Sequence, residues 1–132
     1  MRFLLTPVGS YGDVNPFIAV GHGLKARGHE VIVFAPEPFG ESVREAGLEF
    51  VRSSTVEEFE QIIGNSDLWD PWNGLSVVLR ALASRLDENY RTLESIYREG
   101  ETVLVGHSLS LATRVLEEIK GCPAATVHLA PF

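Results

Sequence analysis

Val8-Gly9-Ser10-Tyr11-Gly12-Asp13-Val14-Asn15-Pro16 is the stretch of sequence that decides the fold. A short apolar run precedes it, and residues 17–28 after it carry apolar side chains at helical spacing. The order strand, glycine-rich loop, helix is typical of open α/β sheets, which bind ligands at the carboxyl ends of their strands. Asn15 is a good N-cap and Pro16 suits a first helical turn, so the pattern predicts a helix over residues 16–27.

The glycine-rich loop matches neither common nucleotide-binding motif. A dinucleotide site needs G-x-G-x-x-G, and here Gly9 is followed by Ser10 and Tyr11. A P-loop needs Gly-Lys-Ser/Thr, which is also missing. One charged side chain, Asp13, remains at the loop. A carboxylate there can act as a general base towards a substrate hydroxyl, or it can cap the following helix.

The rest of the chain alternates between short apolar runs and segments of helical spacing. An unbroken β-branched run such as Val31-Ile32-Val33 is typical of a parallel strand that is buried on both faces. The alternation predicts one α/β domain, a Rossmann-like doubly wound parallel sheet in three α/β/α layers. The strands are expected at residues 2–7, 30–35, 48–51, 102–105 and 124–128, and the main helices at 16–27, 41–46, 75–99 and 109–120.

Two of these helices carry apolar stripes. Leucines and tyrosines recur at steps of three and four over residues 75–99, which predicts one long helix whose stripe faces the sheet. In the helix over 109–120, Ala112, Val115, Leu116 and Ile119 are expected to point inward.

Length and composition restrict the class of protein. The 132 residues suit one domain, and 45% of them are hydrophobic, which is enough for a sizeable core. The net charge of −7 argues against nucleic acid as a partner and against docking on an anionic membrane. No apolar run is long enough to span a bilayer, so a cytoplasmic protein without stable membrane insertion is expected. A single cysteine, Cys122, excludes an internal disulfide, and we expect it to pack as a small hydrophobic residue.

The loop and the residues after it resemble a known family. Gly12-Asp13-Val14-Asn15-Pro16, followed by Leu24-Lys25-Ala26-Arg27-Gly28-His29-Glu30-Val31, is similar to the start of GT-B glycosyltransferases that have a family 28-type N-terminal domain. These enzymes glycosylate sterols, lipids or natural products. The resemblance continues through Phe39 and the segments Arg44–Val51 and Thr126–Pro131.

The resemblance implies a function and roles for residues. It implies the acceptor-binding half of an inverting transferase that moves a hexose from a nucleotide-diphosphate sugar to a hydroxyl of a small lipid, sterol or natural-product acceptor. Asp13 would deprotonate that hydroxyl, and Ser10, Gly9 and Gly12 would shape the acceptor site. No metal or cofactor is implied. A C-terminal domain, absent from residues 1–132, would hold most of the donor, so the chain alone is expected to be nearly inactive.

Other side chains are candidates for the acceptor site. Trp69 and Trp72 fall in the loop 64–74, where they either line a binding surface or form a satellite core. His107 and His128 follow the strands expected at 102–105 and 124–128. Right-handed crossovers and the family pattern give the strand order 3-2-1-4-5, which places Asp13 and His107 across the switch point between the first and fourth strands.

Two alternatives stay open. The domain could bind a small molecule or a partner without catalysis. Gly106-His107-Ser108-Leu109-Ser110 also resembles the G-x-S-x-G nucleophile elbow of α/β-hydrolases, with Ser110 in place of the last glycine, which would make Ser108 a nucleophile. Little chain follows Ser108 to supply the remaining hydrolase strands.

Overall fold

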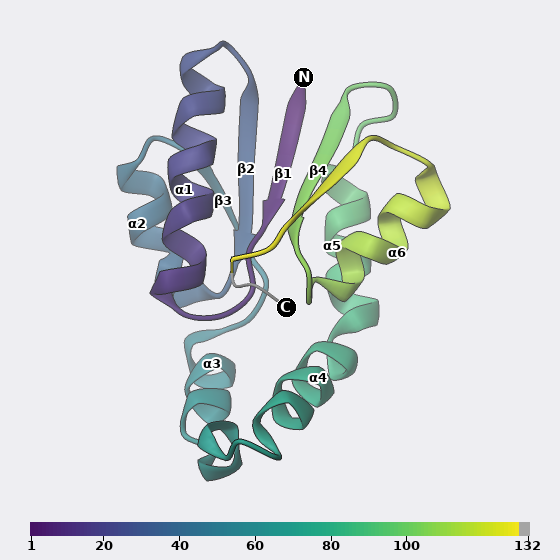
Figure 1. Cartoon of the computed structure of the whole chain (residues 1–132). Helices are drawn as coiled ribbons and strands as arrows, with labels where there is room; N and C mark the ends of the chain where they lie inside the picture. Colours follow the sequence, from purple (N-terminus) through teal and green to yellow (C-terminus); the bar gives the residue numbers. More distant parts are fainter. Residues whose placement is uncertain (130–132) are drawn as a thin grey trace.

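The computed structural model describes residues 1–129. Five strands form one parallel sheet: β1 (Arg2–Thr6), β2 (Glu30–Ala35), β3 (Glu49–Arg52), β4 (Thr102–His107) and β5 (Ala124–Val127). Their order is β3-β2-β1-β4-β5, as predicted, so the chain reverses its direction of winding between β1 and β4. The Rossmann-like α/β/α fold predicted from the sequence is therefore confirmed (Figure 1).

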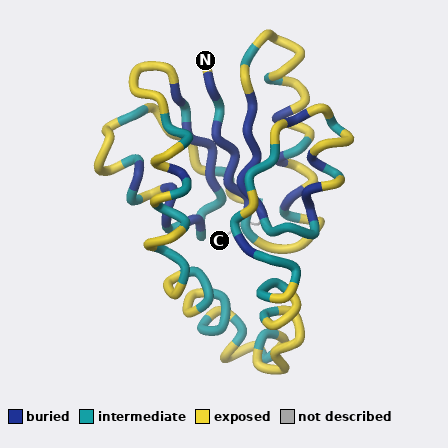
Figure 2. The backbone as a smooth tube through the Cα atoms, turned by 180° about the vertical axis from the view of Figure 1, so that it is seen from behind, coloured by how far each residue is buried: buried dark blue, intermediate teal, exposed yellow. Residues whose placement is uncertain are grey.

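Helices cover both faces of the sheet. On one face lie α1 (Tyr11–Ala26), the 3-10 turn η1 (Glu37–Phe39) and α2 (Gly40–Glu45), and on the other lie α5 (Leu86–Ile96) and α6 (Leu111–Lys120). Neighbouring residues of one strand enter opposite cores: Leu5 packs under α1 and α2, and Leu4 packs under α5 and α6. Both are fully buried, as the unbroken apolar strands predicted. Figure 2 shows the buried backbone concentrated in the strands.

The remaining helices project from the sheet. After β3 the chain forms α3 (Val56–Ile63), the 3-10 turn η2 (Ser66–Trp69) and α4 (Gly74–Ser84), which extend beyond the carboxyl ends of the strands (Figure 1). We call α3, η2 and α4 the projection. No described helix is both long and apolar enough to cross a bilayer.

The prediction of one long helix over residues 75–99 was wrong. The helix breaks at Arg85, between α4 and α5. The guanidinium of Arg85 donates to the carbonyl of Ser53 at 3.1 Å and pairs with Glu58 of α3, so α4 tilts towards α3 instead of continuing along the sheet. Leu75 and Leu79 of the predicted stripe are consequently exposed.

Two further expectations were wrong in detail. Helix α1 begins at Tyr11 and not at Pro16, because Ser10 and not Asn15 is its N-cap. Ile119, expected to point inward from α6, is 61% exposed. Gly21 of α1 shows why the helix lies close to the sheet: a Cβ built there would lie 2.7 Å from Leu48 Cδ1.

Candidate functional site

The candidate site lies at the carboxyl ends of β1 and β4. The register pairs Thr6 with Gly106, so the loop after β1 and the side chain of His107 leave the sheet at adjacent positions. Val127 pairs with His107 from the other side, which brings His128 to the same edge. Asp13 and His128 both act electrostatically on His107. The fold therefore brings together three of the side chains that the sequence selected.

Asp13 is held against the loop backbone. Its Oδ2 accepts a hydrogen bond from the backbone N–H of Ser10 at 3.0 Å, and the Ser10 hydroxyl lies 3.5 Å from the same oxygen. Gly9 has φ +124°, and a Cβ built on it would lie 2.1 Å from Asp13 Oδ2. Only glycine accommodates both this backbone and this carboxylate.

Asp13 is also the third residue of α1, where its carboxylate forms part of a capping box with Ser10. The capping role allowed by the sequence is therefore observed. The spacing Ser10-x-x-Asp13 is the sequence signal for this helix start. The pair Asn15-Pro16 resembles a helix start as well, and the start was predicted there instead. The cap uses Oδ2 alone. No described protein group donates a hydrogen bond to Oδ1, so capping leaves the second oxygen available for a ligand.

The imidazole of His107 is fixed by the turn that follows β4. The backbone N–H of Leu109 donates to His107 Nδ1 at 3.0 Å. Burial lowers the pKa of His107 below its ordinary value of 6.5; the negative charge of Asp13 opposes this effect, and His128 adds to it. His107 is therefore neutral at pH 7, with its proton on Nε2.

Three buried hydroxyls support this edge of the sheet from within. Thr113 of α6 donates to Thr6 of β1 at 2.7 Å, and Ser110 lies 2.8 Å from Thr113. These bonds tie the start of α6 to the end of β1, the strand next to β4, which ends at His107. They were not predicted from the sequence, because the bond that links Thr6 to Thr113 joins residues 107 positions apart and leaves no local signal.

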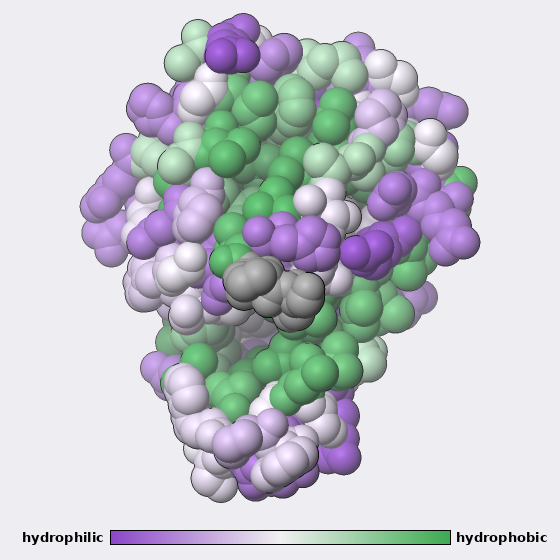
Figure 3. Space-filling model, viewed as in Figure 1, coloured by the Kyte–Doolittle hydropathy of each residue, from purple (hydrophilic) through white to green (hydrophobic). Residues whose placement is uncertain are grey.

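The two tryptophans lie on the projection and not beside Asp13. Trp69 is 72% exposed and Trp72 is 91% exposed, which excludes the satellite core that the sequence had left open. Trp72, Leu75 and Leu79 line a shallow apolar groove along α4. Figure 3 shows hydrophobic side chains over the projection, bordering the indentation between it and the sheet.

A ladder of aromatic rings joins the first turn of α1 to the projection. Tyr11 of α1 packs edge-on against the buried Phe39 of η1 at 4.7 Å, and Phe39 packs edge-on against Phe59 of α3 at 5.4 Å. Tyr11 lies two residues before Asp13 and is 52% exposed. The ladder fixes how α3 sits relative to the first turn of α1. The ladder could not be predicted from the sequence, since its three residues are far apart in the chain.

The hydrolase alternative lacks its defining geometry. A nucleophile elbow holds its serine in a strained turn between strand and helix. Among the described residues, no residue other than glycine has a positive φ, Ser108 included. The carbonyl of Ser108 instead accepts a weak bond from Arg114 at 3.4 Å in an ordinary turn.

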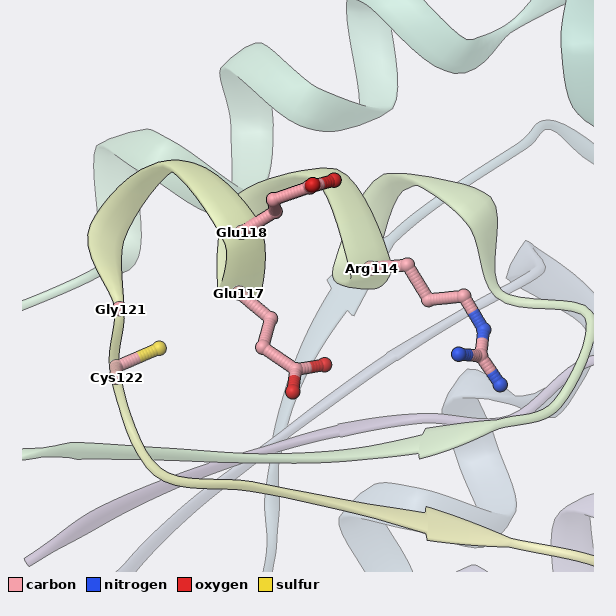
Figure 4. Close-up of a pocket in the computed structure, with 5 residues that line it drawn as sticks. All are labelled: Arg114, Glu117, Glu118, Gly121 and Cys122. Carbon is pink, nitrogen blue, oxygen red and sulfur yellow. The ribbon is translucent and has the colours of Figure 1, made fainter.

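A second depression lies along α6 and the two residues that follow this helix. Arg114, Glu117, Glu118, Gly121 and Cys122 line it, with the cysteine sulfur pointing inward (Figure 4). Burial raises the pKa of the Cys122 thiol, so the sulfur is protonated and weakly nucleophilic at neutral pH. Within residues 1–129, no three His, Cys, Asp or Glu side chains cluster in a way that could hold a metal ion.

Comparison with other proteins gives the same result as the fold. The profile of the glycosyltransferase family 28 N-terminal domain matches residues 3–126. O-mycaminosyltylonolide 6-deoxyallosyltransferase of Streptomyces fradiae is 56% identical over 50 residues, which are 38% of this chain and 12% of that enzyme. An uncharacterized glycosyltransferase of Mycobacterium tuberculosis is 29% identical over 142 residues, covering 99% of this chain and 33% of its own length.

Solved structures share the fold. The glycosyltransferase SnogD from Streptomyces nogalater superposes with a TM-score of 0.75 at 22% identity, over 98% of this chain and 35% of that one. The Streptomyces glycosyltransferase SsfS6, complexed with thymidine diphosphate, superposes with a TM-score of 0.68 at 23% identity, over 96% of this chain and 38% of that one. This chain thus spans about a third of the relatives that match it throughout. It belongs to the glycosyltransferase family 28 N-terminal domain family and has the fold of the N-terminal half of a GT-B glycosyltransferase.

Proposed function

We propose that this chain is the acceptor-binding, general-base half of an inverting nucleotide-sugar glycosyltransferase. The observation that supports the proposal is that the two oxygens of the Asp13 carboxylate have different surroundings. Ser10 anchors Oδ2, and no group in the described part of the chain donates to Oδ1, at the edge of the sheet where α/β folds bind ligands. An anchored carboxylate with one free oxygen is suited to accept a proton from a hydroxyl.

The reaction would proceed in one displacement. The acceptor hydroxyl gives its proton to Asp13 Oδ1 while its oxygen attacks the anomeric carbon of the sugar. The bond from that carbon to the nucleotide diphosphate breaks, and the configuration inverts. Because a carboxylate is a weak base, proton transfer would be concerted with attack.

The donor would be bound mainly by a second α/β domain, because this chain spans only about a third of the length of its relatives. Two structural relatives, SsfS6 and the spinosyn rhamnosyltransferase SpnG, were solved with thymidine diphosphate, which supports a nucleotide-diphosphate hexose as the donor. The sterol 3-beta-glucosyltransferase of Eremothecium gossypii, 48% identical over 36% of this chain and 4% of its own, supports an apolar acceptor. Exposed Trp69 and Trp72 would contact its hydrocarbon part, with Gly9, Gly12, His107 and His128 nearer the hydroxyl.

Replacement of Asp13 by asparagine tests the proposal in the complete protein. The asparagine amide oxygen can still accept from Ser10 N–H, so the cap is kept and the base is lost. With a thymidine-diphosphate hexose, and with O-mycaminosyltylonolide and a sterol as acceptors, we expect turnover to fall by roughly 10²–10⁴-fold. The matched control is Asp87→Asn, an exposed aspartate of α5. Unchanged turnover in D13N would refute the base.

A non-catalytic binding domain is the second candidate. The observation in its favour is the capping box, which gives Asp13 a structural reason to exist without catalysis. The same variant separates the two candidates: in a binding domain, D13N changes neither stability nor ligand affinity, and the unsubstituted protein transfers no sugar.

A further inference from the structure

His107 offers a donor of fixed position beside Asp13. Its Nδ1 accepts from Leu109 N–H at 3.0 Å, so in the neutral ring the proton is on Nε2. The ring is half-buried at the end of β4, and the paired hydroxyls of Thr6, Ser110 and Thr113 hold the neighbouring strand β1 and the start of α6 together. Among the described residues, the hydrogen-bond partner of the ring is on the Nδ1 side, which leaves Nε2–H to meet a ligand.

The two side chains act on each other without bonding. Asp13 influences His107 electrostatically, yet no hydrogen bond joins them in the described part of the chain. Within residues 1–129, no protein group donates to Asp13 Oδ1 and none accepts from His107 Nε2–H. A hydroxyl supplies both missing partners at once, since its oxygen accepts and its proton donates.

We propose that His107 binds the reacting acceptor hydroxyl together with Asp13: Nε2–H donates to the hydroxyl oxygen, and the hydroxyl donates to Asp13 Oδ1. This inference rests on the proposed glycosyltransferase function. His107 keeps its proton throughout. The hydroxyl proton moves to Asp13, and the Nε2–H bond strengthens as negative charge develops on the attacking oxygen. His107 is thus a donor and not a second base.

The neutral state of the ring matters for this role. The charged or titratable groups that face it are Asp13 from α1 and His128 from the segment after β5. An imidazolium would attract the Asp13 carboxylate and weaken it as a base, and it would lose the bond from Leu109 N–H. The hydrogen bond from Leu109 N–H to Nδ1 therefore keeps the His107 ring neutral, with its one N–H donor at Nε2.

Two amide substitutions separate the two sides of the ring. Glutamine places an N–H near the position of Nε2, whereas asparagine places its amide near Nδ1 and can still accept from Leu109 N–H. In the complete protein with Asp13 intact, we expect His107→Asn to lower kcat about tenfold, the effect of one lost hydrogen bond. His107→Gln should stay within about threefold of the original. An unaffected H107N, or equal losses in both variants, would overturn the inference.

A second measurement needs neither variant nor acceptor. Nitrogen-15 NMR of the complete protein with labelled histidine should show His107 with an unprotonated Nδ1 and a protonated Nε2 at neutral pH. A proton on Nδ1 would overturn the inference directly. Failure of the proposed function looks different: D13N then retains full turnover, or no transfer occurs at all, whatever tautomer His107 adopts.

Discussion

The Asp13 carboxylate lies so close to the backbone of Gly9 that a Cβ on Gly9 would be 2.1 Å from Oδ2. Gly9 also has φ +124°, a region that other residues rarely adopt. The two facts have one cause: the loop turns sharply after β1 so that Ser10 N–H meets the carboxylate. The glycine therefore sets the position of the candidate base.

Gly9→Ala should move Asp13 and strain the loop together. We expect a loss of about 1–3 kcal/mol in the free energy of unfolding from the backbone alone. Turnover should also fall, because the added methyl occupies the space of the carboxylate. Chemical denaturation and steady-state kinetics of the complete protein would measure both effects.

Gly23→Ala is the matched control for the loop variant. Gly23 lies inside α1, and a Cβ there meets no atom within 4 Å. The same chemical change should therefore stabilise the protein by about 0.5–1 kcal/mol, since alanine favours a helix over glycine. A Gly9 variant that matched this gain would show that the loop has another conformation.

His107 should titrate below pH 6.5 in the folded protein. Burial disfavours the imidazolium, so its pKa is lowered, while Asp13 alone acts to raise it. A histidine whose pKa is lower in the folded than in the unfolded state gives stability that is present above pH 6.5 and is lost as the pH falls through the folded pKa. Asp13→Asn removes the opposing charge, so the pKa of His107 should fall further. An NMR titration of both proteins measures the shift, and a rise in D13N would contradict the proximity of the two groups.

The sheet could be predicted from the sequence because its signals are local. Val31-Ile32-Val33-Phe34 is an unbroken apolar run, and β2 occupies Glu30–Ala35 as expected. Runs of this kind are buried on both faces whatever their neighbours are, so their pattern alone reveals them. The strand order was predicted from the handedness of the crossovers together with the family resemblance, and the structure confirms it.

The errors arose where distant contacts decide the structure. The periodicity of residues 75–99 continues through Arg85, but Arg85 bonds to Ser53 and Glu58, and these bonds break the helix. Asn15-Pro16 looks like a helix start, yet Ser10 and Asp13 start α1 one turn earlier and Pro16 lies within it. Asp13 and His107 could be chosen from their places after strands, whereas the bond from Leu109 that sets the His107 tautomer was not visible in the sequence.

Arg85→Ala should loosen the projection. The substitution removes the ion pair with Glu58 and the hydrogen bond to the Ser53 carbonyl. The Arg85 side chain that makes these contacts is only 23% exposed. Burial favours a neutral Glu58, but bonds from Thr55 and Arg85 outweigh this effect and lower its pKa. We expect a loss of about 1–3 kcal/mol, as for hydrogen bonds to charged groups, and faster amide exchange over α3 and α4. Arg91→Ala, whose ion pair with Asp87 is exposed, should cost less than about 1 kcal/mol and leave that exchange unchanged.

Trp72→Ser tests whether the projection binds the acceptor. Trp72 is 91% exposed, so its loss should leave the free energy of unfolding within about 0.5 kcal/mol of the original. The exposed indole lies beside Leu75 and Leu79, and a bound apolar ligand would cover this apolar surface. We therefore expect KM for an apolar acceptor to rise about tenfold, as for one buried aromatic contact, with KM for the donor unchanged.

The control for this variant is Ile119→Ser. Ile119 is 61% exposed on α6, outside the projection, so the substitution removes exposed apolar surface at a site without a proposed ligand. In the Ile119→Ser variant, KM for the acceptor should stay at the original value. If both variants raise KM equally, the effect is one of general surface hydrophobicity. If neither does, the acceptor does not contact Trp72, and Tyr11, which is 52% exposed and lies two residues before Asp13, is the next exposed aromatic side chain to substitute.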